Sequence, residues 1–179
     1  NNTINIAVVG LGQVGIYLLN ELNIKKKDIE LKTGKKINIV AISARNINKK
    51  RQFKINKKIF FKNPLEIFNK SKVDILFEAI GQSDGVSKKV VETALKKKIH
   101  VITPNKALIS KHGNELAKIA ENNNVNLEFE ASVAGGIPIL RSIKDGLATN
   151  KILKVYGILN GTSNYILSEM ENSNQSFSD

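Results

Sequence analysis

The 179-residue sequence predicts an α/β fold built on a doubly wound, mostly parallel sheet. Short apolar runs rich in Val and Ile alternate with helical stretches, a pattern typical of parallel strands that helices bury on both faces. A glycine-rich turn joins the first apolar run to the first helix. The residue pattern changes after Glu130, where small residues and glycines replace the alternating strands and helices. We therefore expect one domain over residues 1–130 and the incomplete start of an α+β domain over residues 131–179.

The strands are predicted from apolar runs that end next to turn-forming or polar residues. In chain order these runs are 4–9, 37–42, 73–79, 100–102 and 125–129. The helices are predicted from apolar residues three or four positions apart, and Pro64 suits the first position of one of them. In chain order these helices are 13–22, 64–68, 85–97 and 114–121. Residues 25–36 are polar and lysine-rich, which predicts a loop instead.

The last part of the chain has a different pattern. Small residues and glycines predict a loop over 131–138, and a helix is expected over 139–147. Residues 151–159 alternate between apolar and polar side chains, which predicts a strand. A turn over 160–162 then leads into a helix that begins near Asn164.

The composition excludes several classes of protein. The sequence has no cysteine, so it has no disulfide framework and no thiolate metal site. No apolar run reaches the roughly 18 residues that a membrane span needs, so we expect a cytoplasmic protein with no membrane partner. The net charge is +12, but 25 of the 28 basic residues are lysine. Nucleic-acid readers depend on arginine forks and aromatic stacking, so we expect a solvated lysine surface and no nucleic-acid partner.

A G-x-G-x-x-G motif stands between the first strand and the first helix, the context that the dinucleotide fingerprint requires. Gly10 makes the tight turn, Gly12 lets a pyrophosphate approach the backbone, and Gly15 lets the helix pack on the strand. Gln13 and Val14 open the helix whose N–H groups face the phosphate charge. The motif predicts a Rossmann-like, cofactor-binding domain, and a glycine turn without a ligand is the alternative.

The end of the second strand predicts which dinucleotide binds. NAD sites usually place Asp or Glu there, but this strand is followed by Arg45, and no acid lies between Glu30 and Glu66. A guanidinium with lysines nearby suits a 2′-phosphate. NADP is therefore favoured over NAD, and a surface role is the alternative for Arg45.

Three further stretches carry polar groups in turns. They are Thr103-Pro104-Asn105-Lys106, the residues 130–138 and the residues 160–165. Taken in order, GLGQVG, EAIGQSDG, VITPNKAL, EASVAGGIP and YGILNGTSNYIL resemble the homoserine dehydrogenase family over nearly the whole chain. The resemblance implies NAD(P)-dependent reduction of L-aspartate 4-semialdehyde to L-homoserine, in threonine, methionine and isoleucine biosynthesis. Hydride then reaches the aldehyde carbon, and an ammonium stabilises and protonates its oxygen.

The resemblance also implies roles for particular residues. Lys106 matches the family's asparagine-lysine motif at the nicotinamide and substrate site, so we expect it to contact the cofactor and to act in catalysis. An ordinary surface lysine is the alternative. Gly81 and Ser83 match the loop along the nicotinamide half of the cofactor. Gly161 and Thr162 match the turn that borders the substrate.

A sodium site is implied at the glycine-rich turn. Glu130 matches the family's sodium ligand, together with the backbone carbonyls of Val133, Gly135 and Ile137. Oxygen ligands from such a turn suit a hard cation. The alternative for Glu130 is a carboxylate that bonds its own loop.

The resemblance has one large departure, because the family's substrate and dimerisation domain continues well beyond the NGT turn. The acidic residues and the second lysine that the family uses in that continuation have no counterpart before Asp179. We therefore expect a truncated form with weak or no activity alone, and a homodimer for the full-length enzyme. The alternative function is a non-catalytic nicotinamide dinucleotide-binding module.

Overall fold

The computed structural model describes residues 2–51, 53–158 and 160–178. The chain divides into two compact units, Asn1–Val133 and Ala134–Asp179. None of the described helices is long and apolar enough to span a membrane.

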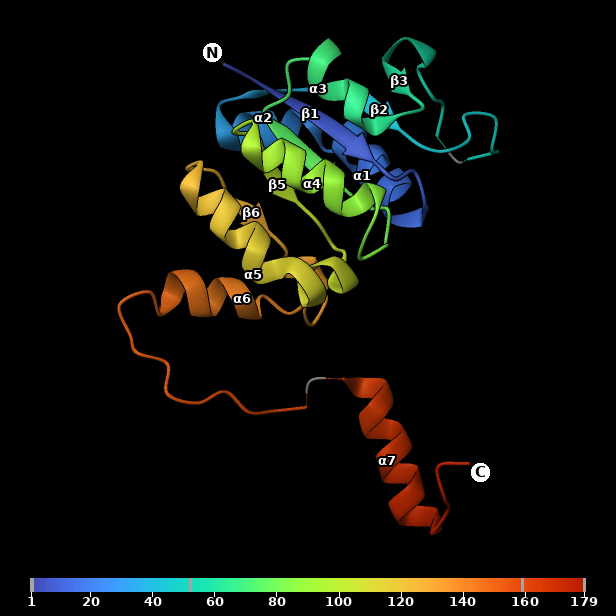
Figure 1. Cartoon of the computed structure of the whole chain (residues 1–179), viewed down its shortest axis with the longest axis vertical. Coiled ribbons are helices and arrows are strands. Elements are labelled where there is room, and N and C mark those ends of the chain that lie inside the picture. Colours follow the sequence, from blue (N-terminus) through green and yellow to red (C-terminus); the bar gives the residue numbers. More distant parts are fainter. Residues whose placement is uncertain (1, 52, 159, 179) are drawn as a thin grey trace. The chain divides into compact units, whose positions relative to one another are not determined.

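The first unit is built on a six-stranded parallel sheet in the order β3-β2-β1-β4-β5-β6 (Figure 1). The strands are β1 (Thr3–Val9), β2 (Lys36–Ser43), β3 (Phe60–Phe61), β4 (Ile75–Glu78), β5 (His100–Ile102) and β6 (Leu127–Glu128). Ile6 of β1 is in register with Ile39 of β2 on one side and with Ile75 of β4 on the other. The strand order reverses between β1 and β4, which confirms the predicted doubly wound sheet.

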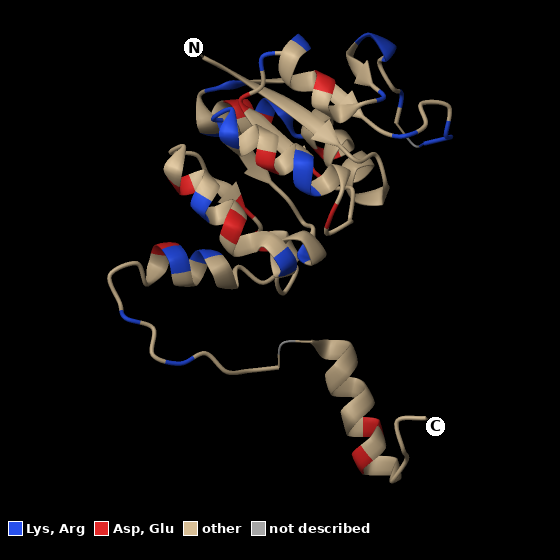
Figure 2. Ribbon diagram, in the orientation of Figure 1, with Lys and Arg blue, Asp and Glu red and all other residues tan. Residues whose placement is uncertain are grey.

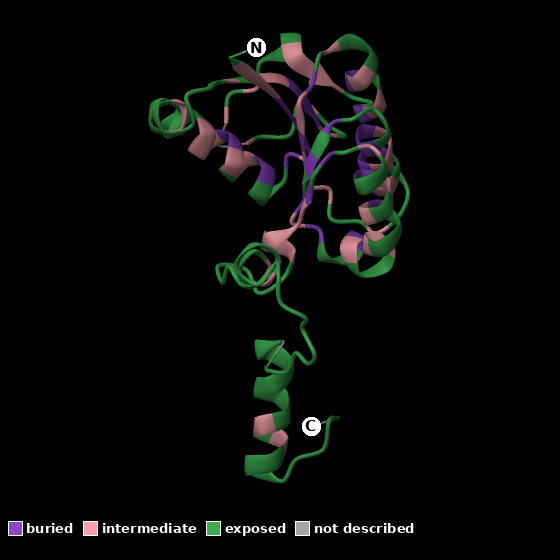
Figure 3. Cartoon of the chain, turned by 90° about the vertical axis from the view of Figure 1, so that its left-hand side faces the viewer, coloured by how far each residue is buried: buried purple, intermediate pink, exposed green. Residues whose placement is uncertain are grey.

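Helices cover both faces of this sheet. They are α1 (Gln13–Ile24), α2 (Lys26–Thr33), α3 (Ile67–Lys70), α4 (Val86–Lys96) and α5 (Lys106–Asn122). Alternate residues of β1 enter two separate cores, since Ile6 and Val8 pack on the α1 side while Ala7 and Val9 pack against α4 and α5. Figure 3 shows the buried residues concentrated on the strands and on the inner helix faces.

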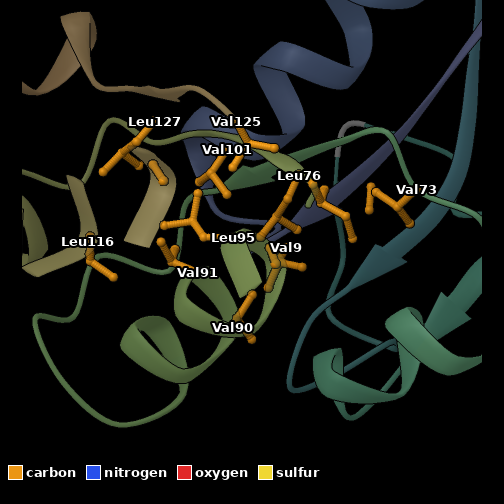
Figure 4. Packing of buried hydrophobic residues seen from close by; sticks show 14 of the residues in the cluster. Val9, Val73, Leu76, Val90, Val91, Leu95, Val101, Leu116, Val125 and Leu127 are labelled. Atoms are coloured by element: carbon orange, nitrogen blue, oxygen red, sulfur yellow. The ribbon is translucent and has the colours of Figure 1, made fainter. Parts of the chain in front are cut away.

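The larger core joins β1, β4 and β5 to α4. Figure 4 shows Val9, Leu76 and Val101 from the strands packed with Val91 and Leu95 from the helix. All five side chains are almost fully buried. The apolar stripe expected for the helix over 85–97 is buried at Val90, Val91, Ala94 and Leu95, whereas its first member, Val86, is 47% exposed. A hydrogen bond from Ser87 Oγ to Glu78 joins the first turn of α4 to the end of β4.

The loop predicted over 25–36 is wrong, because residues 26–33 form α2. No residue of α2 is buried, so its sequence lacks the apolar periodicity by which the other helices were predicted. Ion pairs hold it instead, such as Lys32 Nζ to Asp28 Oδ2 at 3.0 Å. Gly34 ends the helix in the left-handed region with φ of 67°. Glu30 also accepts a hydrogen bond from the backbone N–H of Ile37 at the start of β2.

The second unit contains α6 (Ile139–Arg141), a π-helical turn (Ser142–Gly146) and α7 (Gly161–Ser173). The strand predicted over 151–159 is wrong for 151–158, which form no strand, and residue 159 lies outside the described residues. Leu153 and Tyr156 are more than four-fifths exposed. A strand needs a neighbour for its backbone groups, and the described part of this unit contains no other strand.

Basic side chains are spread over the surface of the first unit. Figure 2 shows Lys and Arg on the outer faces of the helices and along the connection between β2 and α3. Several of the lysines on helices pair with an acid one turn away, as Lys70 does with Glu66 at 2.6 Å. The connection from 44 to 63 has no acidic residue, so its positive charge is not balanced locally.

Candidate functional site

A cavity of about 530 Å³ opens at the carboxyl ends of β1, β2 and β4. Open parallel sheets bind their ligands at this kind of position, outside the strand ends where the strand order reverses. Among the predicted cofactor residues, Gly10, Gly12 and Arg45 line the cavity. Ile80 and Gln82 line it from the loop after β4.

The glycine turn is shaped by close backbone contacts. Gly10 has φ of +96°, and a Cβ there would lie 2.3 Å from the carbonyl oxygen of Ala79. A Cβ on Gly15 would lie 1.9 Å from the carbonyl oxygen of Gly10. A Cβ on Gly12 would meet nothing within 4 Å. Two glycines are therefore required by packing, whereas Gly12 keeps space open at the start of α1.

The first turn of α1 has free backbone donors. Gly12 is its N-cap and has no side chain to accept hydrogen bonds from the first N–H groups. Gln13 and Val14 follow, and they line an opening on the outer side of the turn. Unsatisfied N–H groups and the positive end of the helix dipole make this position suited to a phosphate.

The basic side of the cavity comes from the connection after β2. Arg45, Lys49, Arg51 and Lys62 line the cavity, and no acidic residue does. Arg51 donates hydrogen bonds to four backbone carbonyls, including that of Leu11 at 3.2 Å, and so fixes this connection against the glycine turn. Arg45 is exposed and makes no hydrogen bond or ion pair with the residues that the structure describes. Of the two arginines, Arg45 has the guanidinium available for a ligand.

Lys106 is the first residue of α5 and its side chain is exposed. Among the described residues it has no hydrogen-bond or ion-pair partner. The predicted helix over 114–121 is confirmed but begins eight residues earlier, because the Asn105 side chain caps α5 by accepting a hydrogen bond from the backbone N–H of Leu108 at 3.1 Å.

Gly81, with φ of +88°, and Ser83 lie in the loop between β4 and α4.

Glu78 is the residue that the sequence did not reveal. It is the last residue of β4 and is fully buried. Its carboxylate accepts hydrogen bonds of 2.7 Å from the backbone N–H of Ile80, from Ser87 Oγ and from Thr103 Oγ1. Asn105 Nδ2 lies 3.4 Å from both carboxylate oxygens. These donors come from the loop after β4, from α4 and from the end of β5.

The loop between β4 and α4 is also held by Asp84. Lys111 Nζ donates to Asp84 Oδ2 at 2.8 Å, Ser83 Oγ donates to it at 2.6 Å, and His112 Nε2 lies 2.9 Å from Oδ1. These hydrogen bonds, that of Lys111 first, hold the pKa of Asp84 well below its ordinary value of 3.8. The Lys88 ammonium, 2.8 Å from Glu115, likewise lowers the pKa of Glu115.

This shift predicts how Asp84 affects stability at low pH. A carboxyl whose pKa is lower in the folded state stabilises the fold above its unfolded pKa, and that contribution is lost as the pH falls. We expect Asp84→Asn to lower the free energy of unfolding at pH 7. Its difference from the wild type should shrink below about pH 4. Urea denaturation of the variant and of the wild type, at pH 7 and below about pH 4, measures this difference in the free energy of unfolding. A difference that stays constant with pH would contradict the prediction.

The remaining predicted residues lie at or beyond the boundary between the units. Gly161 and Thr162 begin α7, and Asn160 caps this helix by accepting a hydrogen bond from the N–H of Ser163 at 2.9 Å. For the sodium site, Glu130 and Val133 belong to the first unit, and Gly135 and Ile137 belong to the second. The carbonyl of Ile137 already accepts a hydrogen bond from the N–H of Ile139. The substrate and sodium roles stay predictions.

The sheet order, the glycine turn and the basic cavity define a Rossmann-type dinucleotide-binding domain. Residues 10–130 match the family model described as homoserine dehydrogenase, NAD binding domain, and residues 138–179 match the model described as homoserine dehydrogenase. The chain belongs to the homoserine dehydrogenase family, which confirms the resemblance of its motifs.

Relatives cover nearly the whole chain. The homoserine dehydrogenase of Neisseria gonorrhoeae is 39% identical over 98% of the chain. A homoserine dehydrogenase structure from Thiobacillus denitrificans has a TM-score of 0.80 at 35% identity and covers 99% of the chain, and one from S. aureus has 0.77 at 38% identity and covers 98%. The chain spans 40%, 41% and 42% of these three proteins, respectively.

Proposed function

We propose that this chain binds a nicotinamide dinucleotide in the cavity beside the glycine turn and forms the cofactor-binding part of a homoserine dehydrogenase. The observation that carries the proposal is the combination of an uncapped helix N-terminus with open space at Gly12. Membership of the family supports the reaction, which is the reduction of L-aspartate 4-semialdehyde to L-homoserine. Since the chain spans about 40% of its relatives, we expect it to bind cofactor with weak or no turnover alone.

Lys106 has the chemistry that this reaction needs. When bound, the cofactor supplies hydride to the aldehyde carbon, and negative charge develops on the aldehyde oxygen. The Lys106 ammonium at the start of α5, which has no ion-pair partner in the part of the chain that the structure describes, would stabilise that charge and donate the proton. We assign Gly81 and Ser83 to the nicotinamide side, and Gly161 and Thr162 to the edge of the substrate site.

Four finer assignments belong to the same proposal. They are NADP as the preferred cofactor, a homodimer for the full-length enzyme, a cytoplasmic location and a sodium ion bound near Glu130. The sodium assignment is supported by its donor set, since one carboxylate and the carbonyls of Val133, Gly135 and Ile137 are oxygen ligands suited to a hard cation. Thermal melting of the chain in sodium and in potassium chloride tests it, and equal melting temperatures would count against it.

The preference for NADP is tested at Arg45. Its guanidinium lines the cavity at the end of β2 and is available for a 2′-phosphate. Loss of a hydrogen-bonded charge pair costs about 1.5–3 kcal/mol, so Arg45→Ala should weaken NADPH binding by roughly 10–150-fold. NADH binding should change little, because NADH has no 2′-phosphate. Fluorescence titration with both cofactors measures the ratio.

A matched control is Lys57→Ala, which removes a charge from the same connection at an exposed position that lines neither the cavity nor the opening beside Gln13 and Val14. It should change both affinities only slightly. Equal losses for NADPH and NADH in Arg45→Ala would show that Arg45 acts on the fold or the pyrophosphate, and would contradict the assignment to the 2′-phosphate.

Binding and turnover are measured separately to test the function itself. The chain is titrated with NADPH by nicotinamide fluorescence and then assayed for NADP-dependent oxidation of L-homoserine. Saturable binding with little turnover is the expected result. Absence of binding to either dinucleotide would overturn the proposal. Turnover of about 1 per second or more, in the range of ordinary enzymes, would overturn the expected weak activity.

A further inference from the structure

The burial of Glu78 is not explained by packing. A carboxylate withdrawn from water is costly unless hydrogen bonds satisfy it, and an apolar side chain would fill the same space at no such cost. Glu78 is 0% exposed, and its hydrogen-bond donors among the described residues are neutral groups, from Ile80, Ser87, Thr103 and Asn105. These donors come from three separate segments: the loop after β4, the first turn of α4 and the residues that follow β5.

Asn105 extends this network to α5. Its backbone N–H donates to Thr103 Oγ1 at 3.0 Å, and its Nδ2 donates to Ser87 Oγ at 3.0 Å and to the carbonyl of Gln82 at 2.9 Å. Its Oδ1 caps α5, whose first residue is Lys106. The position of Lys106 and the course of the loop over 79–85 are therefore set by one connected group of hydrogen bonds.

The network has a single direction of proton donation. Each of the two hydroxyls, on Ser87 and Thr103, accepts a hydrogen bond from Asn105 and donates its one proton to Glu78. The N–H of Ile80 can only donate. A group that accepts at both oxygens is required at the centre, and an ionised carboxylate is the side chain that does this.

We propose that Glu78 is a positioning residue for the nicotinamide half of the cofactor site. The inference rests on the proposed function. In a doubly wound sheet the two halves each bind one nucleotide, and the half with β1 and β2 holds the glycine turn and Arg45. The half with β4 and β5 therefore receives the nicotinamide. Glu78 holds Ile80 in the cavity wall directly, and through Asn105 it holds Gln82 in the same wall and the start of α5, where Lys106 lies.

Glu78→Gln separates this role from simple packing. Glutamine has nearly the same volume, but its NH₂ group places a donor where the network supplies donors. A hydroxyl of Ser87 or Thr103 that turned to accept from this NH₂ group would leave its own proton without the acceptor it has now, and the N–H of Ile80 can only donate. In Glu78→Gln we expect the loop over 79–85 and the start of α5 to lose their fixed conformation. The glycine turn, on the other half of the sheet, should keep its conformation.

The experiment compares two ligands on the full chain. NADPH contacts both halves of the site, whereas 2′-phospho-ADP-ribose has the adenosine, the 2′-phosphate and the pyrophosphate but no nicotinamide. The wild type should bind NADPH more tightly. Glu78→Gln should weaken NADPH by about tenfold, as expected for the loss of one or two hydrogen bonds, and change 2′-phospho-ADP-ribose by less than about twofold.

Two further variants complete the test. Val101→Ala removes a buried side chain from β5 in the same core, so it should lower stability without changing the ratio of the two affinities. Ser87→Ala removes one hydrogen-bond donor to Glu78 and leaves the others. It should therefore weaken NADPH binding by about threefold and again leave the affinity for 2′-phospho-ADP-ribose nearly unchanged. If Glu78→Gln does not fold, Ser87→Ala decides.

The outcomes distinguish the inference from the function on which it rests. Equal weakening of both ligands in Glu78→Gln, or no change in either, would overturn the positioning role and leave cofactor binding intact. A wild type that binds both ligands equally would do the same, because the nicotinamide half would then contribute nothing. A wild type that binds neither ligand would overturn the proposed function, and the positioning role with it.

Discussion

Gly15→Ala is expected to lower the free energy of unfolding of the first unit by about 3 kcal/mol, the upper end of the cost of overpacking. The new Cβ would lie 1.9 Å from the carbonyl oxygen of Gly10. That oxygen belongs to the backbone of the turn, which the hydrogen bond from Gly10 N–H to the carbonyl of Ser43 fixes at 2.9 Å. Neither α1 nor the turn can move away without disturbing the packing of α1 on the sheet.

Gly113→Ala is the control for this substitution. Gly113 lies within α5, and a Cβ there would meet Cγ2 of the Ile109 side chain at 3.3 Å, a contact that a shift of a few tenths of an ångström relieves. Because alanine favours helix by about 1 kcal/mol over glycine, this variant should be close to the wild type or more stable. Urea denaturation of both variants measures the contrast. Equal stability of Gly15→Ala and the wild type would show that the turn does not have the close packing described.

Gly12→Ala should keep the fold and lose the cofactor. A Cβ at Gly12 meets nothing within 4 Å, and the backbone there has φ of −78°, which any residue adopts. The methyl group would occupy the space through which a pyrophosphate reaches the first N–H groups of α1. Losing two hydrogen bonds to a charged group costs about 3 kcal/mol or more, so NADPH should bind at least roughly 100-fold more weakly.

Two measurements on Gly12→Ala make this result specific. The melting temperature should equal that of the wild type, while the NADPH titration should show the large loss. Gly12→Ala and Gly15→Ala thus separate the two uses of glycine in one motif. Unchanged affinity in Gly12→Ala would place the pyrophosphate away from this turn and would count against the proposed cofactor site.

The parallel sheet was predictable because its signals are local. Each central strand contains a short apolar run, and the first helix follows directly from the glycine turn. The helix α2 was not predictable from periodicity, since its side chains pair with each other and bury nothing. The strand expected over 151–159 failed for the opposite reason, because an alternating pattern does not supply the neighbouring strand that its backbone needs.

The cofactor site was predictable at the positions where a sequence motif corresponds to a known backbone geometry, as in the glycine turn. Gly10, Gly12 and Arg45 line one cavity, as their positions after β1 and β2 indicate. The division of roles between Arg45 and Arg51 was not predictable, because the four carbonyls that hold Arg51 come together only in the folded chain. Glu78 was hidden for the same reason, since its donors lie up to 27 residues away.

The position of β1 at the centre of the sheet has a consequence for how the chain folds. β1 is synthesised before β4, and the pairing of these two strands joins segments 69 residues apart in sequence, as the hydrogen bond from Asn5 N–H to Asp74 shows. Closing a loop of that length costs entropy before any contact repays it. The apolar run of β1 can therefore be paired on one side at most until β4 has been synthesised.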